Sequence, residues 1–399
     1  MVVIKLLIRT SAICLLLTAQ AGHATAWENL ENVEFSAKEI SNKIERLMTA
    51  NQVKGLAVAL IKNGEVQHIS ALGKRMVEKN LPLEADTIIY GASLTKATFA
   101  YLVMQLLDEG LINLDASIAT YLPQPLPEYD DYRDLAHEPR WKNLTLRILL
   151  NHTTGFANFR VFDQYGDYSK DGKLGIYFDP GSRYAYSGEG YQLAQFVLEE
   201  GLGLDVAKEM QTRIFDRFGM TNTSMTWQEK FLNNYSHNYT INGENIRHAV
   251  RNRANAAGSM DTTLADWSKF LAAVARGEGL NQASRQEMLK TQIRIHSVTQ
   301  FPTLREATTD RYENIQLGYG LGWGVFKSPF GKAFFKEGHD DGTANYALCI
   351  DPVATCILLM SNSVRAEGIF KELVDTLIGD TQLPWHWEGY IPYNLADDS

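Results

Sequence analysis

The sequence predicts an α/β fold of the α+β type, with one antiparallel sheet built from both ends of the chain and a mostly helical region inserted between them. A helix and a hairpin pattern come first, a long block of helical segments follows, and strand patterns return before a last helix. At 399 residues the chain exceeds the roughly 250–300 residues that one hydrophobic core supports. We therefore expect two packed halves, residues 27–90 with 251–399 and residues 91–250, with a cleft between them.

The first half opens with a helix and a hairpin. Residues 35–50 carry apolar side chains at helical spacing. Residues 55–61 form an apolar strand, Asn63-Gly64 is typical of a tight hairpin turn, and residues 66–72 supply the partner strand. These two strands form one side of the expected sheet.

A long apolar helix starts at Ser93 and is ended by Gly110. Polar loops separate the shorter helical segments of residues 111–250, strand patterns return from Gly318, and residues 368–379 form the last helix. The alternating glycines that begin at Gly318 lack the strand-to-helix setting of a dinucleotide site. They predict instead a strand that another backbone approaches closely.

Residues 1–26 have the pattern of a secretory signal. Lys5 and Arg9 supply the positive start, residues 11–19 an apolar stretch, and an A-x-A site ends at Ala26. The alternative is a membrane anchor, but the apolar run is shorter than the roughly 18–20 residues a span needs. We expect cleavage after Ala26, a periplasmic or secreted protein, and no membrane span in the mature chain.

The composition narrows the class of protein further. With 45% hydrophobic and 21% charged residues, the chain is typical of a folded globular protein rather than a disordered or collagen-like one. Its formal charge of -9 argues against a nucleic acid partner, for which a basic surface is expected.

Two of the three cysteines, Cys349 and Cys356, lie in a predicted hairpin. Two apolar strands are joined there by a turn that contains Asp351 and Pro352. If Pro352-Val353 is the two-residue loop, the cysteines lie opposite each other at a separation that allows a disulfide. Two buried free thiols fit the same pattern, so the sequence leaves both states open.

The first chemical signal is Ser93 followed by Lys96. At the first turn of a helix, this spacing puts the hydroxyl and the amine on one face, within reach of each other. The helix N-terminus favours an alkoxide and a neutral amine, so that Lys96 can act on the Ser93 proton. The same spacing also fits an N-capping serine followed by a surface lysine.

Two more segments fit a serine nucleophile. Tyr186 lies in a Gly-rich loop before a predicted apolar helix, and a phenol close to an ammonium is expected to have a lowered pKa and to act as a base. An ordinary half-buried loop tyrosine is the alternative. Residues 336–343 form a polar strand edge that can present a backbone N–H to a substrate carbonyl.

With these segments the chain resembles the beta-lactamase-related serine hydrolases, which include class C beta-lactamases, D-alanyl-D-alanine carboxypeptidases, D-aminopeptidases and lactamase-like esterases. The resemblance extends over nearly all of the chain after residue 26. Further matching segments are residues 109–115, 121–123, 144–156, 256–263 with Asp266, and 318–323.

The resemblance implies roles for individual residues. Ser93 is the acylated nucleophile, Lys96 its amine partner and Tyr186 the catalytic tyrosine. Gly188 stands where the family has an asparagine. The implied reaction is a two-step acyl transfer that needs no cofactor and no metal.

The resemblance also assigns the third family motif, Lys-Thr-Gly or His-x-Gly, to His339 and the two residues after it. The oxyanion hole then consists of the backbone N–H groups of Ser93 and Gly342. Asp341 stands where the family prefers glycine, close to the expected oxyanion. Gly188 lacks the asparagine carboxamide, and a mostly neutral imidazole at His339 holds a substrate carboxylate poorly. Both departures favour esterase, peptidase or amidase activity over beta-lactam hydrolysis.

The resulting prediction is an exported serine hydrolase that acts on a small-molecule ester, amide or peptide. The alternatives are a class C-type beta-lactamase or D-alanyl-D-alanine carboxypeptidase, and a non-catalytic binder of cell-wall fragments or of another protein. The absence of a Gly-x-Ser-x-Gly motif argues against an alpha/beta-hydrolase. His152 is expected to be a structural hydrogen-bonding residue.

Overall fold

A computed structural model describes residues 26–163 and 165–395. The predicted signal segment lies outside the described residues, apart from Ala26 at its end. Within the described residues, no helix is both long and apolar enough to cross a membrane.

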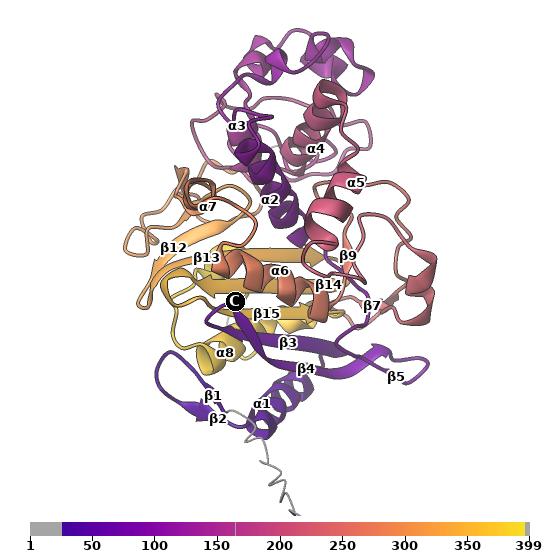
Figure 1. The fold of residues 1–399 in the computed structure, drawn as a ribbon, viewed down its shortest axis with the longest axis vertical. Helices are drawn as coiled ribbons and strands as arrows, with labels where there is room; N and C mark the ends of the chain where they lie inside the picture. The colour runs from indigo at the N-terminus through magenta and orange to yellow at the C-terminus, as the bar shows by residue number, and fades with distance from the viewer. Residues whose placement is uncertain (1–25, 164, 396–399) are drawn as a thin grey trace, which may run out of the picture.

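An antiparallel sheet forms the centre of the molecule (Figure 1). Within the described residues it has nine strands in the order β10-β11-β12-β13-β14-β15-β3-β4-β5. The chain ends meet where β15 pairs with β3, as the sequence predicts. The strands of this sheet are β3 (Gly55–Lys62), β4 (Glu65–Met76), β5 (Leu81–Pro82), β10 (Ile293–Arg294), β11 (Gly318–Tyr319), β12 (Gly324–Ser328), β13 (Gly331–Asp340), β14 (Thr343–Ile350) and β15 (Thr355–Ser361).

Six short strands form small ribbons outside the main sheet. They are β1 (Trp27–Glu28), β2 (Glu34–Phe35), β6 (Ile89–Tyr90), β7 (Asn238–Tyr239), β8 (Asn245–Ile246) and β9 (Asp261–Thr262). The helices are α1 (Ala37–Ala50), α2 (Leu94–Asp108), α3 (Leu146–Leu150), α4 (Gly188–Phe196), α5 (Val206–Met210), α6 (Leu264–Arg276), α7 (Gln282–Leu289), α8 (Glu367–Leu377) and α9 (Trp385–Glu388).

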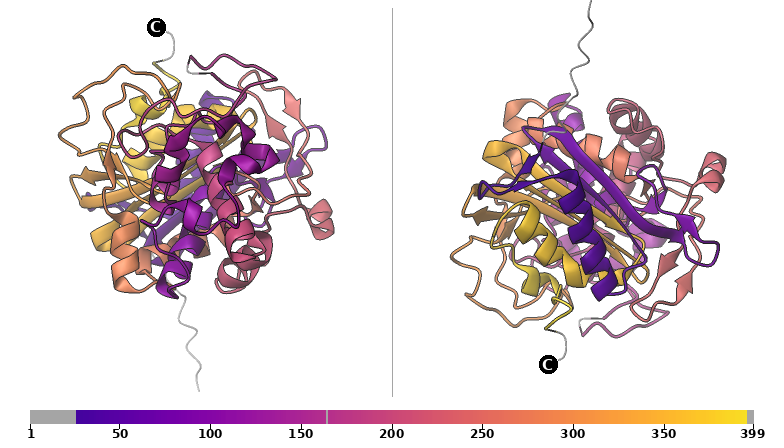
Figure 2. Two further views of the ribbon diagram at one scale, coloured as in Figure 1. Left: turned by 90° about the horizontal axis from the view of Figure 1, so that it is seen from above. Right: turned by 90° about the horizontal axis from the view of Figure 1, so that it is seen from below.

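Helices cover both faces of the sheet. Figure 2 shows α1 and α8 lying across one face, and α2 and α6 pack on the other. Side chains of β3 alternate between the two cores, with Leu56 and Val58 on the α1 side and Ala57 and Ala59 on the α6 side. Burial on both faces explains why β3 is apolar from Gly55 to Ile61.

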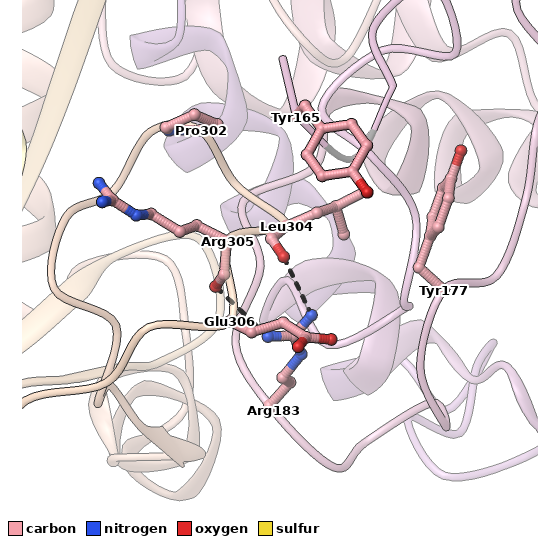
Figure 3. A pocket seen from close by; sticks show the side chains of 7 residues that line it. All are labelled: Tyr165, Tyr177, Arg183, Pro302, Leu304, Arg305 and Glu306. Carbon is pink, nitrogen blue, oxygen red and sulfur yellow. Dashed lines mark hydrogen bonds between the residues drawn. The ribbon is translucent and has the colours of Figure 1, made fainter.

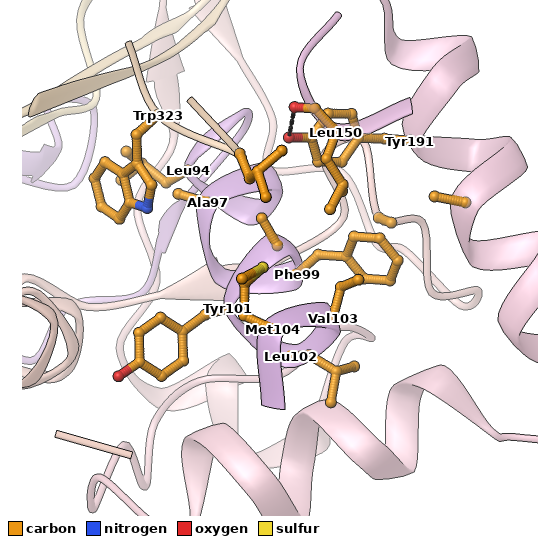
Figure 4. Packing of buried hydrophobic residues seen from close by; sticks show 14 of the residues in the cluster. Leu94, Ala97, Phe99, Tyr101, Leu102, Val103, Met104, Leu150, Tyr191 and Trp323 are labelled. Atoms are coloured by element: carbon orange, nitrogen blue, oxygen red, sulfur yellow. Dashed lines mark hydrogen bonds between the residues drawn. The ribbon is translucent and has the colours of Figure 1, made fainter. Parts of the chain in front are cut away.

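The helix α2 joins the sheet to the helical region drawn above it in Figure 1. Its side chains from Leu94 to Leu106 are all buried, which fits a helix that is apolar on every side. Figure 4 shows Trp323 from the sheet side and Tyr191 from α4 packed around it. Gly322 has a φ of +86°, and a Cβ there would lie 2.5 Å from the Ala100 Cβ. The predicted close backbone approach in the glycine-rich segment therefore occurs against α2.

The cysteine hairpin consists of β14 and β15, in which Cys349 lies opposite Cys356. The two cysteines form a disulfide with a Cα–Cα distance of 4.1 Å. The turn spans the four residues between Ile350 and Thr355, instead of the two considered from the sequence. Because the longer turn is centred on the same pair of residues, the register is the one that a two-residue loop predicts.

Candidate active site

Ser93 and Lys96 lie at the first turn of α2. Lys96 Nζ is 3.0 Å from Ser93 Oγ and 2.6 Å from the carbonyl oxygen of Ala257. Lys96 is buried and Ser93 is half-buried. The prediction that helical spacing brings hydroxyl and amine within reach is confirmed.

Two segments that are distant in the sequence hold this turn in place. The Gly91 N–H donates to the Met260 carbonyl at 2.9 Å, and the Met260 N–H donates to Thr95 Oγ1 at 3.2 Å. From β14, the Asn345 side chain donates to the Tyr90 carbonyl at 2.9 Å. The nucleophile turn is therefore fixed to both the sheet and the 257–260 segment.

Tyr186 lies between two lysines. Its ring packs against His152, with centroids 4.2 Å apart, and against Phe301 at 5.6 Å. The ammonium groups of Lys96 and Lys336 lie 4.9 and 5.1 Å from its ring centroid. Lys336 Nζ also donates to the Tyr186 hydroxyl at 3.3 Å. Residues far apart in the sequence thus meet around one phenol.

Burial shifts the pKa values of Tyr186 and Lys96 in opposite directions. Burial raises the pKa of Tyr186 well above its usual value, and the negative charge of Glu337 adds to the shift. The prediction that a neighbouring ammonium lowers this pKa is therefore wrong, because desolvation of the phenolate outweighs the attraction. Burial lowers the pKa of Lys96 well below its usual value, and the charge of Lys336 adds to that shift. Burial thus favours the uncharged form of both groups.

His152 accepts a hydrogen bond from the loop that carries Tyr186. The backbone N–H of Ser187 donates to His152 Nδ1 at 3.0 Å, so the proton of the neutral ring is on Nε2. Burial lowers the pKa of His152 well below its usual value, and the charges of Lys96 and Lys336 lower it further. A neutral ring stacked on Tyr186 agrees with the structural role expected from the sequence.

Lys336 completes the cluster and was not recognised as a site residue in the sequence. It lies on β13, which passes the first turn of α2 at Gly338. A Cβ on Gly338 would lie 2.7 Å from the Gly91 carbonyl oxygen and 3.2 Å from the Leu94 nitrogen. Only glycine lets the strand approach this closely. The Lys-x-Gly spacing of Lys336 and Gly338 is the signal that points to it.

The assignment of the third motif to His339 stays a prediction. Lys336, three residues earlier on β13, is the residue of this strand that contacts Tyr186. The His339 side chain is 48% exposed and bonds Glu367 of α8. Asp341 is exposed in the turn after β13. Gly342 lies in that turn, where a Cβ would be 2.6 Å from the Asn238 Cβ, and its oxyanion role stays a prediction.

Gly188 has a packing reason for being glycine. A Cβ there would lie 2.6 Å from the Phe159 ring, and the Gly188 N–H donates to Asn158 Oδ1 at 3.0 Å. The Arg160–Glu189 ion pair at 2.8 Å ties the Phe159 segment to α4. An aromatic ring thus contacts the position where the family has an asparagine carboxamide.

A hollow of about 600 Å³ opens beside the 257–259 segment. Its wall includes Ala257, whose carbonyl accepts from Lys96, together with Phe159, Arg253 and His339. Phe159 gives this space an apolar surface, and Arg253 gives it a charged one. It is large enough for the acyl part of a small substrate.

A second hollow, of about 530 Å³, adjoins the loop that carries Phe301 (Figure 3). Tyr165 and Tyr177 line one side. Arg183 donates to the carbonyls of Leu304 and Arg305 at 3.3 and 3.4 Å. These bonds connect the loop that carries Phe301 to the segment that carries Tyr186.

Among the described residues, one group has side chains close enough to share a metal ion. It consists of His296, Asp310 and Glu313, whose ligand atoms lie within 4.8 Å of one another. All three are exposed, and exposed acidic groups of this kind are common without a metal.

Residues 40–374 match the family model for Beta-lactamase. The chain belongs to the beta-lactamase family. Its similarity to a penicillin-binding protein homologue from Pyrococcus abyssi, with a TM-score of 0.69 and 19% identity over 88% of this chain and 80% of the other, shows the same fold. The beta-lactamase-related fold expected from the sequence is confirmed.

Curated proteins with similar sequences have different enzyme names. The chain is 28% identical over 204 residues to an ML-236A carboxylate methylbutanoyltransferase of Penicillium citrinum, covering 45% of this chain and 49% of the relative. It is 26% identical over 227 residues to a D-aminopeptidase of Gluconobacter oxydans, covering 54% of this chain and 42% of the relative. The matches thus span about half the length of these two relatives.

Proposed function

We propose that the protein is a serine hydrolase that cleaves an ester or amide bond of a small molecule through an acyl-enzyme on Ser93. The observation that carries the proposal is the 3.0 Å contact between Ser93 Oγ and the buried amine of Lys96. Burial lowers the pKa of that amine, so the contact joins a hydroxyl to a base. Relatives named as a methylbutanoyltransferase and a D-aminopeptidase support acyl transfer from an ester or an amide.

The proposed reaction has two steps. Lys96 accepts the Ser93 proton as Oγ attacks the substrate carbonyl, and the Tyr186 phenol donates a proton to the leaving oxygen or nitrogen. Lys96 then returns its proton to Tyr186. Water attacks the acyl-enzyme with proton transfer in the reverse direction and releases the acid. Because its raised pKa keeps the phenol protonated, Tyr186 has a proton to donate to the leaving group.

The oxyanion is stabilised by backbone N–H groups. Pairing between β12 and β13 ends at Phe335, so the outer edge of β13 from Lys336 to Asp340 is free of that strand. Gly338 brings this edge against the helix turn that carries Ser93. We place the two donors at the Ser93 N–H and on this free edge.

Labelling with a fluorophosphonate tests the proposal. We expect the wild type to be labelled and Ser93→Ala to remain unlabelled, while Ser182→Ala, an exposed loop serine, is labelled like the wild type. A protein that only binds cell-wall fragments or another protein is not labelled. Absence of labelling, or equal labelling of Ser93→Ala, would contradict the proposed function.

Action on beta-lactams or D-alanyl-D-alanine peptides is a second candidate. The observation that favours it is Lys336, because an ammonium beside the catalytic tyrosine can hold a substrate carboxylate. Turnover of nitrocefin is compared with that of p-nitrophenyl butyrate. Faster turnover of the ester supports the first candidate, and faster turnover of nitrocefin supports the second.

We propose export to the periplasm or the medium, with residues 1–26 removed. The signal-like sequence supports this, and so does the Cys349–Cys356 disulfide, because disulfides persist mainly in oxidising compartments. The test is the N-terminal sequence of the protein purified from a periplasmic extract or culture medium. A start at Trp27 is expected, and a start at Met1 would contradict the proposal.

A further inference from the structure

The Lys336 ammonium is already paired with groups of the protein itself. Its Nζ lies 2.6 Å from the Glu337 carboxylate, 3.0 Å from the Glu337 carbonyl oxygen and 3.3 Å from the Tyr186 hydroxyl. An ammonium has three N–H donors, and these three contacts use all of them. The Lys336 and Glu337 side chains are 0% and 7% exposed, so little water weakens the pair.

Gln300 contacts the same Glu337 carboxylate oxygen as Lys336. Its Nε2 donates to Glu337 Oε1 at 3.3 Å, and both residues are buried. The Glu337 carboxylate thus already supplies negative charge near Tyr186. This charge contributes to the raised pKa of Tyr186. A substrate carboxylate bound next to Tyr186 would find Lys336 already paired and would be repelled by the Glu337 carboxylate.

In the proposed mechanism the leaving group of the substrate lies beside Lys336 and Glu337. Tyr186 donates to the leaving group, and Lys336 contacts the Tyr186 hydroxyl, so the leaving group lies on the Lys336 side of Ser93. We place the acyl group in the hollow lined by Ala257, where Arg253 supplies a cation. Glu337 therefore acts on the leaving group alone.

We infer that Glu337 is a specificity residue that restricts the site to substrates whose leaving group carries no carboxylate, such as esters of uncharged alcohols. This inference rests on the proposed function and names the substrate class of the same site. It disfavours D-alanyl-D-alanine peptides and beta-lactams, because their carboxylate lies on the leaving side of the scissile bond.

A matched pair of esters tests the inference, phenyl butyrate and 3-carboxyphenyl butyrate. For the wild type we expect kcat/KM at least tenfold higher for the neutral ester. In Glu337→Thr and Glu337→Gln the released Lys336 donor can bind the added carboxylate, and the ratio should fall by roughly tenfold, the effect of one charge-assisted hydrogen bond. A second pair, p-nitrophenyl butyrate and p-nitrophenyl hydrogen succinate, carries the carboxylate on the acyl side and should keep its ratio.

The control is Glu306→Gln, which removes one carboxylate from the exposed 302–306 loop and should leave both ratios unchanged. Equal rates of the wild type on the two phenyl esters would overturn the inference, whether or not the variants fold. The inference would also be overturned if the Glu337 variants label with fluorophosphonate but keep the wild-type ratio of the two phenyl esters. A change of that ratio in Glu306→Gln as large as in the Glu337 variants would overturn it too. Failure of the wild type to label overturns the proposed function and this inference with it, whereas labelling with an unchanged ratio overturns this inference alone.

Discussion

Burial decides which protonation form is favoured for two residues of the proposed active site. Lys96 and Tyr186 are both fully enclosed, and desolvation disfavours the charged form of each. For the lysine the uncharged form is a base, and for the tyrosine it is an acid. The same physical effect thus assigns two opposite roles to neighbouring groups.

The pH dependence of acylation should report Lys96. Because burial lowers its pKa, kcat/KM should rise with pH through that pKa and level off well below the usual range of a lysine. Lys96→Arg, which stays protonated, should lose about a thousandfold in kcat/KM. The measurement is a pH profile on a neutral p-nitrophenyl ester. A rise only near the usual pKa of lysine, or an active Lys96→Arg, would contradict this assignment.

Removal of one hydroxyl separates the role of Tyr186 from its packing. Tyr186→Phe should lower kcat about a hundredfold, because the leaving group loses its proton donor, while ring contacts with His152 and Phe301 remain. Tyr319→Phe is the matched control. The Tyr319 hydroxyl is buried and bonds none of the described residues, although its ring also packs on His152. Comparable losses in the two variants would indicate that packing, not proton transfer, is responsible.

At the scale of elements, the site depends on two close approaches to α2. β13 approaches the first turn through Gly338, and the segment before β12 approaches the middle of the helix through Gly322. Each approach needs a residue without a Cβ. The catalytic geometry is therefore set by helix–strand contacts as well as by the side chains themselves.

Gly322→Ala tests the importance of the second approach. Its φ is +86° and its new Cβ would lie 2.5 Å from the Ala100 Cβ, so we expect a loss of about 3 kcal/mol in the free energy of unfolding. Gly110→Ala is the control, because its φ is +71° and nothing lies within 4 Å of a Cβ there. That change should cost only about 1 kcal/mol. Urea unfolding measures both, and equal losses would mean that backbone strain alone explains the effect.

At the scale of the whole molecule, the sheet holds together the two ends of the chain. β14 and β15 come from the C-terminal part, β3 and β4 from the N-terminal part, and they are adjacent in the sheet. The Cys349–Cys356 disulfide links the C-terminal pair. Stabilisation of this hairpin should therefore stabilise the global fold rather than a local region.

Replacement of both cysteines by alanine should lower the free energy of unfolding by about 2.5 kcal/mol, the loop-closure entropy of a ring of this size. Urea unfolding with and without dithiothreitol measures the effect. The reductant should destabilise the wild type and leave the double variant unchanged. An identical unfolding midpoint of wild type and double variant would show that the bridge adds nothing to stability.

The sequence by itself determined the features that depend on neighbours in the chain. Periodicity gives the sheet strands and α2, and the spacing of Ser93 and Lys96 gives their contact, because three residues are nearly one helical turn. The tertiary structure decided the rest. Lys336 enters the site only because β13 passes α2 at Gly338, and the pKa of Tyr186 is raised only because segments far apart in the chain enclose it. Strand registration against a distant helix and desolvation are properties of packing, and no local pattern contains them.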